Sequence, residues 1–139
     1  MTNFVNNSSG DLVYAIDQSN GLQKWTEAVI ATSNYDVTTK DFDFGNPGVR
    51  KKVYKVYITH KGTGTRPTPY FDVNGETSLN KTFTETLGSS SSWTTTSLTP
   101  STSSQANNIY SFQLKISGSM GTDFEINDIS IVYRLKPVK

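Results

Sequence analysis

The sequence predicts an all-β fold: an antiparallel β-sandwich of about eight strands, jelly-roll-like, with little helix. Three observations carry this prediction. Serine, threonine and asparagine are abundant, and their short polar side chains compete for backbone hydrogen bonds within helices. Short alternating segments recur between turn-forming residues. Hydrophobic residues occupy only 34% of the 139 positions while aromatic residues occupy 12%, which favours a thin core between two layers.

The first residues differ from the rest in composition. Residues 1–36 are rich in asparagine and serine, and we expect them to form an N-terminal arm or extension with one short strand at 12–17. The β-sandwich domain then spans residues 37–139. The one helix candidate is LQKWTEAVIA at 22–31, whose second half also suits a strand.

The first strands of the sandwich surround a strong turn. Residues 35–44 alternate in polarity, Gly45–Asn46–Pro47–Gly48 turns the chain, and residues 51–61 form the next strand. The parity of 51–61 separates an apolar face from a face rich in lysine. The first face holds Tyr54, Val56 and Ile58, and the second holds Lys51, Val53, Lys55, Tyr57 and Thr59.

The middle of the chain continues the β pattern. Residues 70–73 predict a short strand, and Asn74–Gly75 predicts a hairpin turn because both positions tolerate positive φ. The return strand is expected at 76–79. A threonine-rich strand is expected at 93–98, after a serine loop.

The last two strands show the clearest alternation. Residues 109–117 place four apolar side chains on one face, and residues 124–135 change parity midway. A one-residue slip reverses the facing of every following side chain, so we predict a β-bulge at Asn127–Asp128 that restores it. The buried face of the first strand is expected to hold Tyr110, Phe112, Leu114 and Ile116.

Charge and composition exclude several functions. The net charge of +1 gives no overall field to attract nucleic acid or an anionic membrane, so neither is expected as a partner. The start MTNFVNNSSGD lacks the pattern of a secretory signal, and no stretch approaches the ~20 apolar residues of a membrane span. We therefore expect a soluble protein. Cysteine is absent, which excludes disulfides and thiolate chemistry.

Catalytic and metal-binding residues are sparse. His60 is the one histidine, and its position near a strand end favours a structural side chain, so we expect neither an enzyme nor a cofactor. Asp41 and Asp43 are expected to neutralise residues 50–52 across the turn. The alternative for the acidic residues is calcium binding, completed by backbone carbonyls. The carboxylates considered for it are Asp41, Asp43, Asp123, Glu125 and Asp128.

Two sets of residues are candidates for contact with a partner. The candidate basic contact surface holds Arg50, Lys51, Lys52 and Lys55, and we favour a solvent or protein-interface role for it over phosphate binding. Exposed aromatic residues favour a subunit interface, with a sugar-stacking platform of Trp25, Tyr57, Tyr70 and Trp93 as the alternative. The interface candidates are Phe4, Val5, Trp25, Tyr57 and Trp93.

Two segments resemble structural proteins of short-tailed marine bacteriophages. They are TTKDFDFGNPGVRKKVYKVYITHKG at 38–62, and NNIYSFQLKISG with DFEINDISIVYRLKPVK within 107–139. In that group such segments tend to occur in tail or head-completion proteins. The resemblance implies a location in the virion, major capsid or tail proteins as partners, and a homo-oligomer. FEINDISIVYR is also similar to the last strand of jelly-roll carbohydrate-binding modules.

The resulting expectation is a non-enzymatic virion structural protein. It is a small capsid decoration or cement protein, or a tail-associated protein, which stabilises the particle through protein–protein contacts. The N-terminal arm is expected to add a strand to a neighbouring subunit. The alternative function is a glycan-binding module that contacts the host surface.

Overall fold

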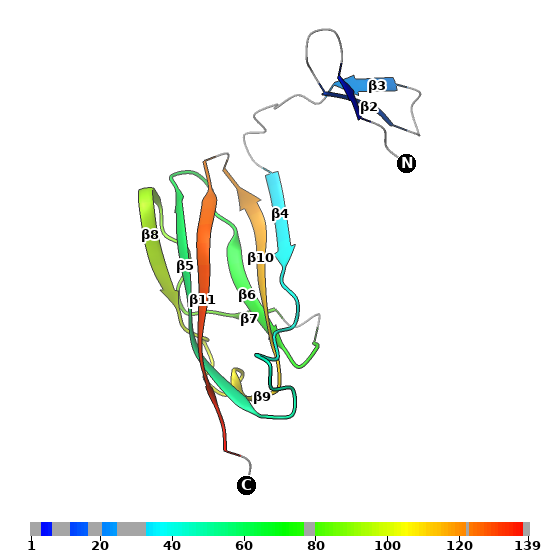
Figure 1. Ribbon diagram of the computed structural model, residues 1–139. Helices are drawn as coiled ribbons and strands as arrows, with labels where there is room; N and C mark the ends of the chain where they lie inside the picture. The colour runs from blue at the N-terminus through cyan, green and yellow to red at the C-terminus, as the bar shows by residue number, and fades with distance from the viewer. Residues whose placement is uncertain are drawn as a thin grey trace. The chain divides into compact units, whose positions relative to one another are not determined.

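The computed structural model describes residues 4–6, 12–16, 21–24, 33–76, 80–121 and 123–137. The chain divides into two compact units, residues 1–30 and 31–139 (Figure 1). Every regular element in the described ranges is a β-strand, and no helix occurs among them. The predicted all-β fold class is confirmed.

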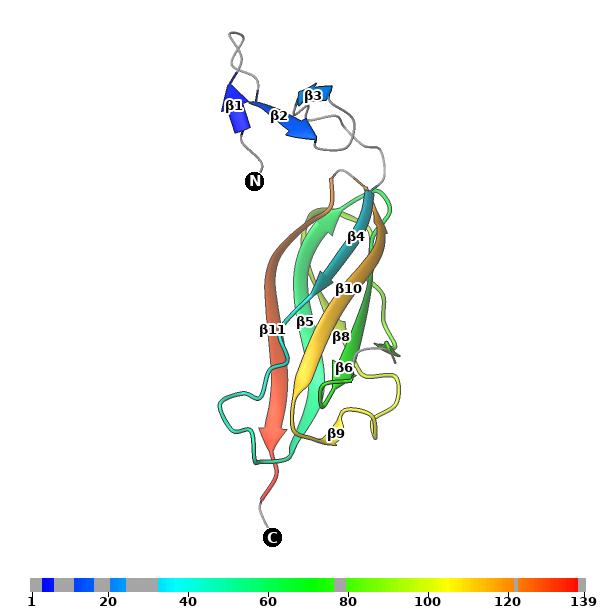
Figure 2. The same cartoon turned by 90° about the vertical axis from the view of Figure 1, so that its right-hand side faces the viewer.

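The first unit contains a small antiparallel sheet. It consists of β1 (Phe4–Asn6), β2 (Leu12–Ile16) and β3 (Gly21–Lys24), in the order β1-β2-β3 (Figure 2). The short strand predicted at 12–17 is confirmed as β2. The helix predicted at 22–31 is wrong at its start, since Gly21–Lys24 pairs with β2, and residues 25–31 lie outside the described residues.

The second unit is a sandwich of two antiparallel sheets (Figures 1 and 2). One sheet has the order β4-β10-β6-β7, and the other has the order β11-β5-β8 with β9 paired to the start of β5. Because β4 begins at Ser33, the sandwich includes the last residues of segment 1–36. The strands are β4 (Ser33–Thr38), β5 (Lys51–Gly62), β6 (Thr68–Val73), β7 (Lys81–Thr82), β8 (Ser90–Leu98), β9 (Asn107–Ile109), β10 (Phe112–Met120) and β11 (Glu125–Leu135).

The core lies between the two sheets and is rich in aromatic and β-branched residues. Phe71 stacks on Phe112 with ring centroids 5.4 Å apart, and its ring lies 5.0 Å from that of Phe83. Phe112, Leu114 and Ile116 are buried on β10, as their alternation predicted. Burial of such side chains contributes roughly 1.5–3 kcal/mol each.

A bulge in β11 keeps its apolar residues on the core side. Ile126 pairs with His60 while Asp128 pairs with the adjacent Thr59, so Asn127 is an extra residue in the ladder. This is the predicted bulge at Asn127–Asp128, and it is confirmed. Ile126 and Ile131, on either side of it, both pack against the core.

A second irregularity, in β5, reverses part of the predicted facing. Val132 pairs with Lys55 but Tyr133 pairs with Val53, so Tyr54 is the extra residue. Val53 is therefore buried with Val56 rather than facing solvent. The assignment of Tyr54 to the apolar face and Val53 to the lysine face is wrong for this reason.

The loop between β4 and β5 is less regular than predicted. Strand β4 ends at Thr38, after which Thr39 N donates to Leu114 O over 2.9 Å and the Phe42–Phe112 bridge continues the pairing within the strand predicted at 35–44. The predicted turn at 45–48 is present, with Val49 N donating to Asn46 O over 3.2 Å.

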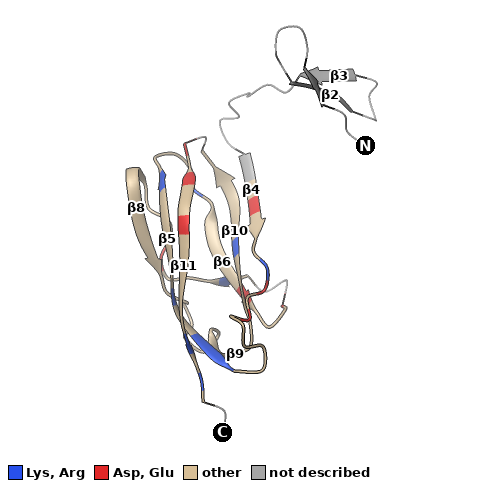
Figure 3. Cartoon of the chain, in the orientation of Figure 1, with Lys and Arg blue, Asp and Glu red and all other residues tan. Residues whose placement is uncertain are grey.

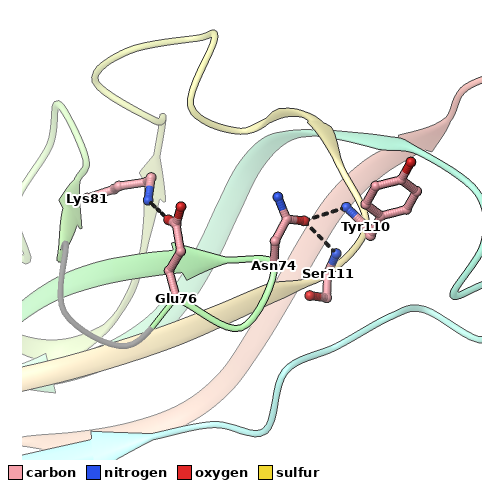
Figure 4. A network of polar contacts seen from close by, with 5 residues as sticks. All are labelled: Asn74, Glu76, Lys81, Tyr110 and Ser111. Atoms are coloured by element: carbon pink, nitrogen blue, oxygen red, sulfur yellow. Dashed lines mark hydrogen bonds and ion pairs between the residues drawn. The ribbon is translucent and has the colours of Figure 1, made fainter.

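The Asn74–Gly75 hairpin turn is confirmed, with positive φ angles of 56° and 74°. The Asn74 Oδ1 atom accepts hydrogen bonds from the backbone nitrogens of Tyr110 (2.7 Å) and Ser111 (3.4 Å), as Figure 4 shows. Glu76 forms an ion pair with Lys81. Residues 77–79 of the predicted return strand lie outside the described residues.

Tyr110 was expected in the core but is 41% exposed. It lies in the break between β9 and β10, where the ladder to β6 has not yet begun. The hydrogen bond to Asn74 holds its backbone in this break.

Candidate functional site

The outer face of the sheet β11-β5-β8 gathers most of the predicted contact residues. Alternate residues of β5 are buried, so those between them point away from the core. Trp93 of β8 joins this face, since its ring centroid lies 5.0 Å from the Nζ atom of Lys61. The outward side chains of β5 are Lys52, Tyr54, Lys55, Tyr57, Thr59 and Lys61.

The bulge places Tyr54 between two cations. The Lys52 Nζ atom lies 4.8 Å from the centroid of the Tyr54 ring, and the Arg134 Cζ atom lies 6.0 Å from it. Arg134 is there because β11 runs antiparallel to β5 and pairs it with Lys52. Each such cation–π contact contributes roughly 0.5–1 kcal/mol at an exposed site.

Next to these residues, a basic groove opens at the end of β11. Its volume is about 690 Å³. The Arg50 Nε atom donates to the Tyr110 hydroxyl oxygen over 3.2 Å, and this hydrogen bond raises the pKa of Arg50 above its usual value. The Lys136 Nζ atom donates to Asn108 Oδ1 over 2.7 Å. The lining residues of this basic groove are Gly48, Arg50, Asn108, Tyr110, Arg134, Lys136 and Pro137.

No acidic side chain neutralises these cations within the described ranges. Asp43 Oδ1 accepts from the nitrogen of Gly45 over 2.9 Å, and Asp41 Oδ2 accepts from the Ser111 hydroxyl over 2.8 Å. The expected pairing of these two carboxylates with residues 50–52 is therefore wrong. Figure 3 shows Lys and Arg at the neighbouring ends of β5 and β11. Their charge remains available to an anionic partner.

Lys51 does not belong to the basic contact surface, because its side chain is fully buried with 0% exposure. Its Nζ atom donates to three carbonyl oxygens, those of Asn46 (2.6 Å), Val49 (2.7 Å) and Tyr110 (2.8 Å). It thereby ties the turn before β5 to the segment that carries Tyr110. By holding these backbone segments in place, the buried Lys51 side chain supports the wall of the basic groove.

The opposite end of the outer face has a different chemistry. Trp93 is 48% exposed, and Lys61 is paired with Glu125 at 3.0 Å. A shallow polar groove of about 290 Å³ adjoins Lys61. The residues lining this polar groove are Lys61, Gly62, Thr63, Ser90, Ser91, Asp123 and Glu125.

Asp123 closes the loop beside this groove. Its Oδ2 atom accepts from Thr63 N (2.5 Å) and Thr63 Oγ1 (2.6 Å), and its Oδ1 atom accepts from Gly64 N (3.3 Å). The hydrogen bonds from Thr63, the larger cause, and from Gly64 lower the pKa of Asp123 to about 2. Across the described part of the chain, no group of three or more His, Cys, Asp or Glu residues is placed to hold a metal ion.

His60 is enclosed in the core. Its side chain is fully buried, its Nε2 atom lies 2.9 Å from Thr96 Oγ1, and its ring centroid lies 6.1 Å from that of Phe124. Burial is the main cause that lowers the pKa of His60, and the charge of Arg66 adds to it. A neutral ring sealed from solvent has no access to a substrate.

The structure thus places Tyr57, Lys52 and Lys55 on one outer face with Trp93, which lies beside Lys61 at the end opposite Arg50 and the basic groove. Phe4 and Val5 lie in β1, where only the backbone is described, and Trp25 lies outside the described residues. Sequence reasoning missed four residues of the site. They are Tyr54, Tyr110, Arg134 and Lys136. The available sequence signal for the groove was the pair of cations Arg134 and Lys136, two positions apart. It points to residues 50–52 once 125–135 is paired antiparallel with 51–62.

Comparison with known proteins adds no relative: no family model, curated protein or solved structure matches the chain. No helix long and apolar enough to cross a membrane is found in the part of the chain that the structure describes.

Proposed function

We propose that the protein is a non-enzymatic structural protein of a bacteriophage virion, a small capsid decoration or tail-associated protein. It attaches to an acidic surface of another virion protein through the basic groove. The observation that carries the proposal is the cluster of unneutralised cations around Tyr54 and Tyr110. The virion location is supported by the resemblance of segments 38–62 and 107–139 to phage structural proteins.

The chemistry of the groove suits a protein partner. Arginine and tyrosine are enriched in protein interfaces, where their flat side chains cover large areas and still form hydrogen bonds. The Arg50–Tyr110 contact already holds both side chains in place, which reduces the ordering cost of binding. Many identical copies on a particle convert a modest affinity for each into stable attachment.

Charge reversal in the groove tests the proposal. In the variant Arg50→Glu/Lys136→Glu, like charges would face the acidic partner, so we expect at least about a tenfold drop in copies per virion. Quantitative mass spectrometry of purified virions measures that number. The control Lys40→Glu/Lys115→Glu makes the same change in net charge away from the groove, and we expect it to keep the wild-type copy number. Absence of the wild-type chain from virions, or an unchanged copy number in the groove variant, would contradict the proposal.

The exposed Trp93 favours a second candidate, a module that binds host glycans. Its ring lies beside the polar groove, and such an arrangement suits stacking against a sugar with polar groups at the rim. A glycan array separates the two functions. Binding that is lost in Trp93→Ala and kept in Arg50→Glu/Lys136→Glu supports the glycan module, while an array without any binding removes it.

A further inference from the structure

Strand β11 is a long sheet edge, and near its end the Phe44 ring, from the loop before β5, stacks on Tyr133 with ring centroids 4.1 Å apart. The strand comprises residues Glu125–Leu135 and pairs with β5 on one side only; no described strand pairs with its other side. Figure 2 shows β11 at the margin of the second unit. The unpaired N–H and C=O groups of such an edge form a template for another strand.

The side chains of this edge are unusually apolar for a surface that faces water. Ile129 and Tyr133 are each 38% exposed, Val132 is 44% exposed and Leu135 is 41% exposed. Natural edge strands are commonly protected by central charges or proline. In β11 the central residues 129–133 carry neither, and the charges lie beyond them.

The charges at the two ends of this apolar stretch are complementary. Asp128 lies opposite Thr59 and Arg134 lies opposite Lys52, so both side chains belong to the outer face. Asp128 precedes Ile131 by three residues and Arg134 follows it by three. Neither forms an ion pair within the residues that the structure describes. The Asp128 carboxylate accepts a 3.1 Å hydrogen bond from the Ser130 hydroxyl.

We propose that two copies of the protein join their β11 strands antiparallel around a two-fold axis at Ile131. The strands β11-β5-β8 of the two copies then form one continuous six-stranded sheet. Asp128 of each copy faces Arg134 of the other. Ile129 faces Tyr133 of the second copy, and Ser130 faces Val132. Opposite charges and aromatic–aliphatic pairs placed directly across an antiparallel ladder each contribute roughly 0.2–1 kcal/mol.

Parity restricts the alternatives to this register. A two-fold axis perpendicular to the sheet keeps the side chains of both copies on matching faces. The axis can therefore move only from one residue to the next, and each such move shifts the partner of every residue by two positions. Moving the axis to Ser130 would place Asp128 opposite Val132. Moving it to Val132 would place Asp128 opposite Lys136, which lies beyond the end of β11 and already donates to Asn108. The axis at Ile131 alone pairs both free charges.

Sedimentation of the full chain over a range of concentrations tests the dimer. We expect reversible dimerisation that weakens at least about tenfold in Asp128→Arg and in Arg134→Asp, because each brings like charges together. The swap Asp128→Arg/Arg134→Asp restores the opposite-charge pairs, so it should recover dimerisation. Asp36→Arg, an equal change of charge on the exposed β4, serves as the control and should leave it unchanged.

Cysteine pairing tests the register, because the chain contains no cysteine of its own. A mixture of Ser130→Cys and Val132→Cys copies should form a disulfide between the two variants under mild oxidation, and each variant alone should form much less. A protein that stays monomeric, a charge swap that does not restore association, or self-crosslinking of Val132→Cys would overturn the proposal. Arg134 also lines the basic groove, but sedimentation and disulfide formation measure association between copies of the isolated chain, whereas groove attachment is measured as copies per virion, so a failure here is distinct from a failure of groove attachment.

Discussion

Replacing Lys51 by methionine will lower the free energy of unfolding by about 2–4 kcal/mol, measured by urea denaturation. Methionine preserves most of the buried volume but removes the donor that serves the carbonyl oxygens of Asn46, Val49 and Tyr110. Hydrogen bonds to a charged group contribute about 1.5–3 kcal/mol, and buried carbonyls left without a donor are costly. Because the same bonds shape the basic groove, the variant should also attach to virions less well.

Lys55→Met is the matched control, since Lys55 lies on the same strand with an exposed side chain. We expect that variant to unfold within about 0.5 kcal/mol of the wild type. Equal effects of the two substitutions would show that the ammonium group of Lys51 is not held as the structure describes.

Phe112→Ala will cost about 3–5 kcal/mol of unfolding free energy, the usual range for a buried phenylalanine. The Phe112 side chain has 0% exposure and stacks on Phe71, so its removal leaves a cavity between the two sheets. The Phe112 backbone also forms two hydrogen bonds with the Phe42 backbone, with N–O distances of 2.8 and 3.0 Å. Neighbouring residues must keep these two bonds while the cavity forms. Urea or thermal denaturation measures the loss.

Two further variants make the Phe112 result interpretable. Phe112→Leu fills most of the space and should cost about 1.5 kcal/mol or less. Tyr110→Ala, at an exposed aromatic residue just before β10, should cost far less than Phe112→Ala although it also removes a ring. A loss below about 1 kcal/mol for Phe112→Ala would mean that this face of β10 is not the packed core.

The strands that were predicted best are those whose burial pattern is local. In β10 the alternation of Phe112, Leu114 and Ile116 is enough to define one buried face. In β11 the parity change between Ile126 and Ile129 can be explained only by an added residue, so the Asn127 bulge was predictable. Both inferences need nothing beyond the period of a strand.

The facing of β5 near its start was not predictable in the same way. Tyrosine is stable on either side of a sheet and lysine is normally exposed, so Lys51–Val53–Lys55 looked like one polar row. The structure instead buries Lys51, because two carbonyls from the turn before β5 and one from Tyr110 surround its ammonium group. Those carbonyls come from residues 46, 49 and 110, and no local pattern reveals that they meet.

The candidate site was predictable in part for a related reason. Tyr57, Lys52 and Lys55 were found because they share one strand, and Trp93 because it follows a polar loop. Arg134 and Lys136 complete the groove through the antiparallel pairing of β11 with β5, which is a long-range choice. Residues that meet only through strand pairing remain hidden until the sheet order is known.

The chain enters and leaves the sandwich at opposite ends. Ser33 of β4 pairs with Met120, near the Gly62 end of β5, whereas Leu135 of β11 pairs with Lys51 at the other end. Tension applied to the residues flanking β4 and β11 therefore acts parallel to these two strands. The hydrogen bonds that join each strand to its neighbour lie perpendicular to the direction of the pull. The bonds of each ladder bear that load together in shear instead of opening one pair at a time.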